Sequence, residues 1–205
     1  VLCQVIAWLG YLSCGKLRLI AHRNISIALP QVNKAQRGKI IKGVFKNLGR
    51  LLAEFSHLPK LNASNIAEVV VYDGFENYAE AAQRGKGVLY LTAHFGAWEL
   101  CSFSHAIYGY PLKFVVRPLD NPLVDALVNH YRTLSGNKTI EKKNSLKEIL
   151  MTLKQNGAVG ILVDQNSTRD AGIFADFFGV PACTTPSILS IALRTGATII
   201  LAALI

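Results

Sequence analysis

Acidic side chains are absent from the first 53 positions of this 205-residue chain, although the whole sequence contains 13 of them. The same stretch carries nine Lys and Arg residues. The remaining 152 residues carry 13 basic and 13 acidic side chains, so the entire net charge of +9 lies near the amino terminus. A basic segment of this kind can contact nucleic acid or an anionic membrane surface. Because base-stacking aromatic residues are not interleaved with these cations, we expect no nucleic acid partner.

Several common metal-binding and catalytic motifs are also missing. The four cysteines form no C-x-x-C pair, which argues against the usual zinc and redox motifs and predicts reduced thiols. There is no H-E-x-x-H, no phosphate-binding P-loop and no G-x-S-x-G nucleophile elbow. We therefore expect neither a metal nor a cofactor.

The amino-terminal residues are apolar before they become basic. The first 15 residues contain no charge and are followed at once by the cationic stretch, which is typical of a membrane-associating segment. This run is shorter than the roughly 20 apolar residues that a spanning helix needs, so an interfacial helix and a longer span completed upstream both stay open. Residues 34–57 have apolar side chains at helical spacing with a basic opposite face, which suits either a lipid surface or an ordinary core-facing helix. We interpret residues 1–57 as an N-terminal apolar and amphipathic helical segment that associates with a membrane.

From residue 68 onward, after a loop at 58–65, predicted strands and helices alternate. The strands are short and apolar on both faces, a pattern typical of an α/β domain with a central, mostly parallel sheet flanked by helices. This domain is expected to span 58–205 and to be truncated at its carboxyl end, because the last apolar run stops without a following element. The strands are expected at 68–72, 87–93, 113–117, 158–164 and 197–205, and the helices at 75–85, 97–109, 121–136, 145–157 and 186–196.

Three polar residues stand at or just after the ends of predicted strands. They are His94, Arg117 and Asp164. Because active sites in such sheets lie beyond the carboxyl ends of the strands, we expect these side chains to converge at one edge. Glu99 lies five positions after His94 in the first turn of a predicted helix, where its carboxylate could orient the imidazole for general-base catalysis. The alternative is a structural histidine with an acidic residue complementing the helix dipole.

Five sequence blocks occur in the order found in one known family. They are HRNISIALP (22–30), HFGAWE (94–99), RPLDNP (117–122), DQN (164–166) and FFGVPACTTP (177–186). With these blocks the chain resembles the bacterial lipid A biosynthesis acyltransferases, which add secondary lauroyl or myristoyl chains. An isolated H-x-x-x-x-E pattern is weak, whereas five ordered blocks over nearly the whole chain are specific.

The resemblance implies an O-acyltransferase of the H-x-x-x-x-E type that moves a fatty acyl chain from a thioester to a hydroxyl of a lipid A precursor. It implies His94 as the general base and Glu99 as its carboxylate partner. It also implies that Arg117, Asp164 and Gln165 bind substrate, and that FFGVPACTT (177–185) forms a loop near the active site.

The resemblance further implies an acyl donor on acyl carrier protein or coenzyme A. It implies a location at the bacterial inner membrane, with the active site on the cytoplasmic side. Three alternatives stay open: transfer to another glycolipid, transfer to a lysoglycerolipid, and a catalytically inactive membrane-bound scaffold.

Overall fold

The computed structural model describes residues 1–205, apart from the side chain of Asn144. Contacts within the chain divide it into two units, Val1–Ser56 with Thr168–Cys183, and His57–Ser167 with Thr184–Ile205. The first unit thus joins the amino-terminal segment to a short stretch far along the sequence. The sequence-based boundary at residue 57 stays a prediction.

The first unit consists of helices and one β-hairpin. Its elements are α1 (Leu2–Ser13), α2 (Gly15–Ala28), α3 (Lys34–His57), β5 (Ile173–Phe177) and β6 (Val180–Thr184). The helix predicted at residues 34–57 is confirmed by α3. Helices α1 and α3 approach closely at Gly49, where a Cβ atom would lie 2.9 Å from the Cβ of Ala7. Among the helices of the described chain, none combines the length and the apolar character needed to cross a bilayer.

The second unit is built on a five-stranded parallel sheet, which confirms the predicted α/β class, while the membrane association of residues 1–57 stays a prediction. The strand order is β3-β2-β4-β1-β7. These strands are β1 (Val88–Thr92), β2 (Lys113–Val116), β3 (Lys138–Glu141), β4 (Ala158–Leu162) and β7 (Thr198–Leu201). The helices are α4 (Phe75–Gln83), α5 (Trp98–Ile107), α6 (Pro122–Thr133), α7 (Ser145–Lys154) and α8 (Ser187–Thr195), with short 3₁₀ turns at Leu58–Lys60, Ile66–Glu68 and Lys142–Asn144.

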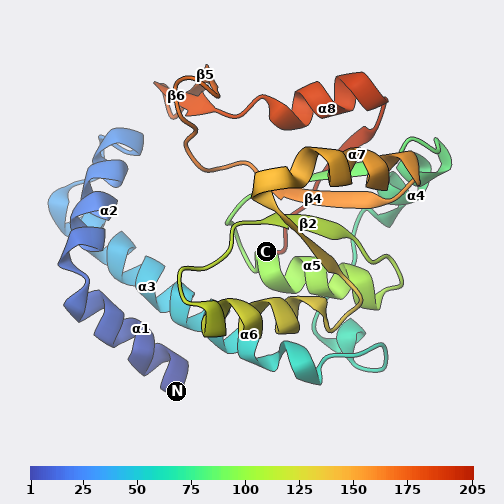
Figure 1. The fold of residues 1–205 in the computed structure, drawn as a ribbon. Helices are drawn as coiled ribbons and strands as arrows, with labels where there is room; N and C mark the ends of the chain where they lie inside the picture. Colours follow the sequence, from blue (N-terminus) through green and yellow to red (C-terminus); the bar gives the residue numbers. More distant parts are fainter. The chain divides into compact units, whose positions relative to one another are not determined.

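Helices cover both faces of this sheet. Because neighbouring residues of a strand point to opposite sides, each strand contributes side chains to both layers of the core. Leu89 and Val159 face one cluster, in which Ile149 and Leu153 of α7 pack with Ile188 of α8. On the other face Val88, Tyr90 and Ala158 pack against Ala81 of α4. Figure 1 shows α7 and α8 on one side of the sheet and α5 on the other. The continuous apolar strands predicted from the sequence are therefore buried on both faces.

Three sequence-based assignments are wrong or incomplete. Residues 68–72 form no strand; Ile66–Glu68 is a 3₁₀ turn, and this β-branched run has no neighbouring strand to pair with. The edge strand β3 was not predicted, because only Ile140 of its four residues is buried. The segment expected as a loop at 177–185 contributes to the β5–β6 hairpin instead.

Candidate active site

His94 and Asp164 meet because they follow adjacent parallel strands at equivalent positions. Thr92 of β1 and Leu162 of β4 are register partners, and each polar residue stands two positions later. The backbone N–H of Val163 donates to the carbonyl of Thr92 at 3.1 Å, which extends the pairing towards the site. The parallel sheet therefore brings together two side chains 70 residues apart in sequence, at its carboxyl edge.

Asp164 holds His94 through two hydrogen bonds. Its Oδ1 lies 2.9 Å from His94 Nδ1, and its Oδ2 accepts from the backbone N–H of His94 at 2.8 Å. Partial burial alone would raise the pKa of Asp164, but the hydrogen bonds and charge of His94 outweigh it, so the pKa lies below its ordinary value. The ionised carboxylate can only accept, so Nδ1 carries the hydrogen, and in the neutral form of the imidazole the lone pair is then on Nε2.

The ring of His94 is also fixed from the side of the following helix. Trp98, the first residue of α5, contacts it edge to face at a centroid distance of 5.2 Å. The side chain of His94 nevertheless stays 40% exposed. The imidazole is therefore oriented by two neighbours and still open to a reactant.

The turn between His94 and α5 depends on Gly96. Its φ of +60° lies in the left-handed region, and its backbone bridges to Leu204. A Cβ atom at this position would overlap the carbonyl oxygen of Leu204. The carbonyl of Leu204 also accepts from the N–H of Ala97 at 3.0 Å. The glycine within HFGAWE thus permits close backbone contact beside the site.

Glu99 does not orient His94, which corrects the expected pairing. Its carboxylate instead forms a bidentate ion pair with Arg132 of α6, in which Arg132 Nε lies 3.0 Å from Oε2 and 3.2 Å from Oε1 and Nη2 also contacts Oε1. Both side chains are about four-fifths buried. Glu99 lies five positions after His94, and because α5 begins only at Trp98, its side chain points towards α6. Asp164 instead binds the ring nitrogen of His94. Arg132 was missed because no local pattern links residues 33 positions apart.

Arg117 and Gln165 lie at the same edge without contacting His94. Arg117 directly follows β2, its side chain is 81% exposed, and its ion pair with the still more exposed Asp120 is long at 3.8 Å. Gln165 is exposed beside Asp164. Both side chains are therefore available to a ligand, and their assignment to substrate binding stays a prediction.

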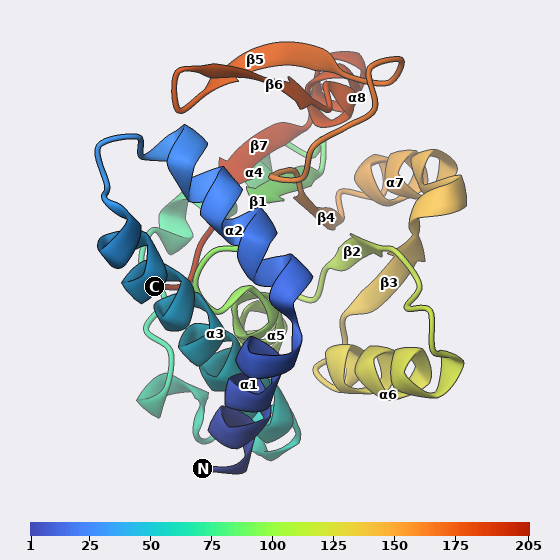
Figure 2. The same ribbon diagram turned by 90° about the vertical axis from the view of Figure 1, so that its left-hand side faces the viewer.

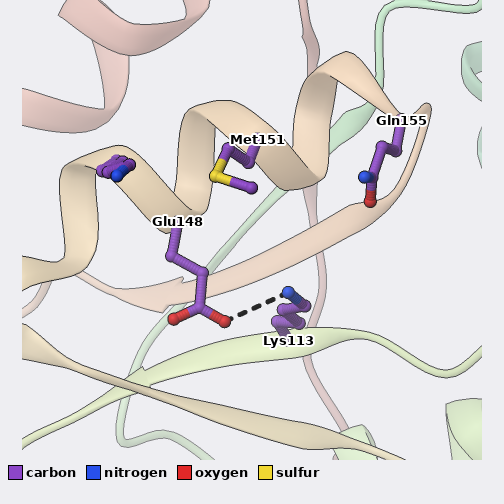
Figure 3. Close-up of a pocket in the computed structure, with 5 residues that line it drawn as sticks. Lys113, Glu148, Met151 and Gln155 are labelled. Carbon is purple, nitrogen blue, oxygen red and sulfur yellow. Dashed lines mark hydrogen bonds and ion pairs between the residues drawn. The ribbon is translucent and has the colours of Figure 1, made fainter.

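One described pocket lies elsewhere in the second unit. Lys113, Lys147, Glu148, Met151 and Gln155 line it, and Lys113 Nζ pairs with Glu148 Oε1 at 3.1 Å (Figure 3). Lys113 is the first residue of β2 and so marks the amino edge of the sheet, opposite His94. This pocket contains none of the predicted site residues, and we do not assign the chemistry to it.

The fold and the site together define an α/β protein with a carboxylate-oriented histidine at the carboxyl edge of a parallel sheet. A family model described as bacterial lipid A biosynthesis acyltransferase matches residues 1–205, and the chain belongs to this family. The family resemblance found in the five sequence blocks is thereby confirmed.

Curated relatives agree with this family. The chain is 23% identical over 193 residues to a lipid A biosynthesis acyltransferase of Haemophilus influenzae, covering 94% of the chain and 60% of the relative. It is 28% identical over 166 residues to the lipid A biosynthesis palmitoleoyltransferase of Escherichia coli, covering 81% and 54%. It is also 28% identical over 185 residues to the lipid A biosynthesis lauroyltransferase of the same organism, covering 88% and 59%. The chain thus spans somewhat more than half the length of these relatives.

Proposed function

We propose that this chain carries the catalytic part of an O-acyltransferase that transfers a fatty acyl group from a thioester to a hydroxyl of a lipid A precursor. The observation that supports this function best is the doubled hydrogen bonding between Asp164 and His94, which leaves Nε2 free as a base. Family membership supports the reaction class, and the names of the relatives support the lipid A precursor as acceptor.

In the proposed reaction His94 Nε2 removes the proton from the acceptor hydroxyl while its oxygen attacks the thioester carbonyl carbon. The Asp164 carboxylate stabilises the imidazolium that forms. When the tetrahedral intermediate collapses, the carbon–sulfur bond breaks and the thiolate takes the proton from His94. The products are an ester and a free thiol, and the imidazole returns to its starting state.

Other residues serve this reaction without meeting the imidazole. We assign Glu99 to positioning, because its ion pair with Arg132 ties the first turn of α5 to α6. The exposed guanidinium of Arg117 suits an anionic group on the acceptor, and the Gln165 amide can bind a sugar hydroxyl.

The amino-terminal unit would hold the enzyme at the cytoplasmic face of the bacterial inner membrane. Its nine cations before Glu54 favour an anionic lipid surface. Seven apolar side chains of the first twelve residues are also exposed: Val1, Leu2, Val5, Ile6, Trp8, Leu9 and Leu12. The donor would be acyl carrier protein, whose acidic surface a cationic enzyme attracts, or coenzyme A.

The test uses the full-length parent protein in detergent micelles. Labelled acyl thioesters of acyl carrier protein and of coenzyme A are each offered with a tetra-acylated lipid A precursor and, separately, with a lysoglycerolipid. Products are identified by mass spectrometry, with His94→Ala as the control. We expect acyl gain on the lipid A precursor, and loss of about 10²–10⁴-fold in rate for the variant.

Each other outcome changes a different part of the proposal. Histidine-dependent gain on the lysoglycerolipid alone would keep the chemistry and replace the acceptor. Full activity of His94→Ala would contradict the catalytic assignment. Transfer to neither acceptor would favour another glycolipid acceptor or the inactive scaffold.

A further inference from the structure

The β5–β6 hairpin exposes apolar side chains on both of its faces. All five residues of β5 are exposed, and so are the turn residue Phe178 and the first residue of β6. Figure 2 shows the two strands β5 and β6 side by side. Ile173, Phe174, Phe177, Phe178 and Val180 are each 41–61% exposed. Isolated two-stranded hairpins are marginal in water, and clustered exposed apolar groups mark contact surfaces. The hairpin therefore needs a covering surface.

The turn of this hairpin retains phenylalanine at a position that disfavours it. Phe178 has a φ of +55° and Gly179 a φ of +73°, the pattern of a turn whose first central position prefers Asn or Gly. The ring of Phe178 packs edge to face on Phe177, with centroids 4.7 Å apart. A bulky residue held in a strained conformation at an exposed tip points to a role for its ring.

We infer that the hairpin tip, residues Phe177, Phe178 and Gly179, inserts into the headgroup–acyl boundary of an anionic phospholipid membrane. Charge favours this occupant, because the hairpin shares its compact unit with the nine amino-terminal cations. The inference deepens the proposed function and rests on its membrane-bound acceptor, and it adds a second, distant segment to the membrane surface.

Insertion must be shallow because an acidic side chain lies beside the tip. Asp176 directly precedes the tip, and its carboxylate accepts from the N–H of Gly179 at 2.8 Å. A charge so close to the tip keeps the hairpin at the level of the headgroups.

The test places a fluorescent amino acid at position 178 of the full-length parent protein, reconstituted in vesicles of phosphatidylglycerol and phosphatidylethanolamine. A second probe replaces Leu193 of α8, which is 88% exposed, as the matched control. Lipids with nitroxides near the headgroup or deep in the acyl chain then quench each probe. We expect blue-shifted emission at position 178, several-fold stronger quenching by the shallow nitroxide, and no quenching at position 193.

Three outcomes would overturn the inference. Blue-shifted emission without quenching by either lipid would mean that protein covers the tip. A blue shift produced by the acyl thioester without vesicles would assign the tip to acyl-chain binding. Equal quenching at positions 178 and 193 would show that the effect is not specific to the hairpin. None of these readouts depends on catalysis, so the inference and the proposed function can fail separately.

A substitution separates lipid contact from folding. Asn adopts the positive φ of position 178 more readily than Phe, so the thermal unfolding temperature of Phe178→Asn should not fall. Losing one buried ring at the membrane should raise KM for an acceptor in vesicles about tenfold, whereas Leu193→Asn should leave it unchanged. An unchanged KM for Phe178→Asn, or a lower unfolding temperature, would contradict the inference.

Discussion

Asp164 binds His94 at two atoms, its ring Nδ1 and its backbone nitrogen, at 2.9 and 2.8 Å. The two residues follow the register partners Leu162 and Thr92, so the same sheet pairing that aligns the strands also aligns the imidazole. A carboxylate that holds both the ring and the backbone fixes the rotation of the ring as well as its tautomer. The orientation of the proposed base is thus set by the core of the fold rather than by a mobile loop.

Asp164→Asn should lower kcat/KM by about 10²-fold or more. An amide cannot accept both hydrogen bonds through two oxygens, and it carries no charge to stabilise the imidazolium. The unfolding free energy should fall by only about 1 kcal/mol, because the pair is partly exposed. Steady-state kinetics and urea unfolding measure the two effects, with the exposed Asp170→Asn as the matched control. Turnover close to wild type in Asp164→Asn would remove this carboxylate from the mechanism.

The positions of His94 and Asp164 could be predicted because buried apolar runs end visibly in the sequence. The contact between the two side chains could not be predicted, because the strand order that makes β1 and β4 neighbours depends on long-range packing. The same limit explains Glu99: its place after His94 suggested a pair, whereas α6 brings the guanidinium of Arg132 to it. Local patterns predicted most of the helices and strands and the edge of the sheet that carries the site, whereas contacts between distant segments determine which side chains pair.

Glu99 and Arg132 should behave as one unit. Glu99→Gln and Arg132→Met should each lower the unfolding free energy by roughly 1.5–3 kcal/mol, because each leaves a charged, largely buried side chain without its oppositely charged partner. The double variant should lose little more than either single variant, because the interaction is already broken. Urea unfolding of the four proteins completes the cycle, with the exposed pair Glu80 and Arg84 as the control. Additive losses would show that the two side chains are not coupled.

His105 should make stability depend on pH between about 4 and 6.5. The ring is 5% exposed among Tyr72, Tyr78, Tyr90 and Tyr110, and burial lowers its pKa to about 4. Its ordinary value is near 6.5, so within this window the unfolded chain binds more protons than the native protein. The unfolding free energy should therefore rise with pH across the window and fall as the pH drops towards 4.

Replacing His105 with Gln removes this titration. The slope of unfolding free energy against pH should flatten between about 4 and 6.5, as measured by urea unfolding in a pH series. His130 is exposed, so His130→Gln serves as a control with the same chemical change. The slope of unfolding free energy against pH that is due to His105 should be unchanged in this variant. An unchanged slope in His105→Gln would mean that another group causes the acid loss of stability.

Arg117 should affect acceptor binding more than folding. Its side chain is 81% exposed, and its ion pair with Asp120, which is 99% exposed, is long at 3.8 Å, so little stability depends on it. Arg117→Ala should raise KM for the lipid A precursor at least about tenfold, if the guanidinium binds an anionic headgroup, while the unfolding temperature stays near that of the wild type. Arg117→Lys keeps the charge without the bidentate geometry and should recover part of the loss.

The acceptor itself supplies the decisive control for Arg117. If the guanidinium recognises a phosphate, the wild type should have a lower KM for a phosphorylated precursor than for its dephosphorylated form. Arg117→Ala should then have about the same KM for both. If the side chain instead stabilises charge that develops during acyl transfer, kcat should fall for both acceptors and KM should change little. Loss of folding in Arg117→Ala would contradict both roles, because an arginine this exposed would then have to be structural.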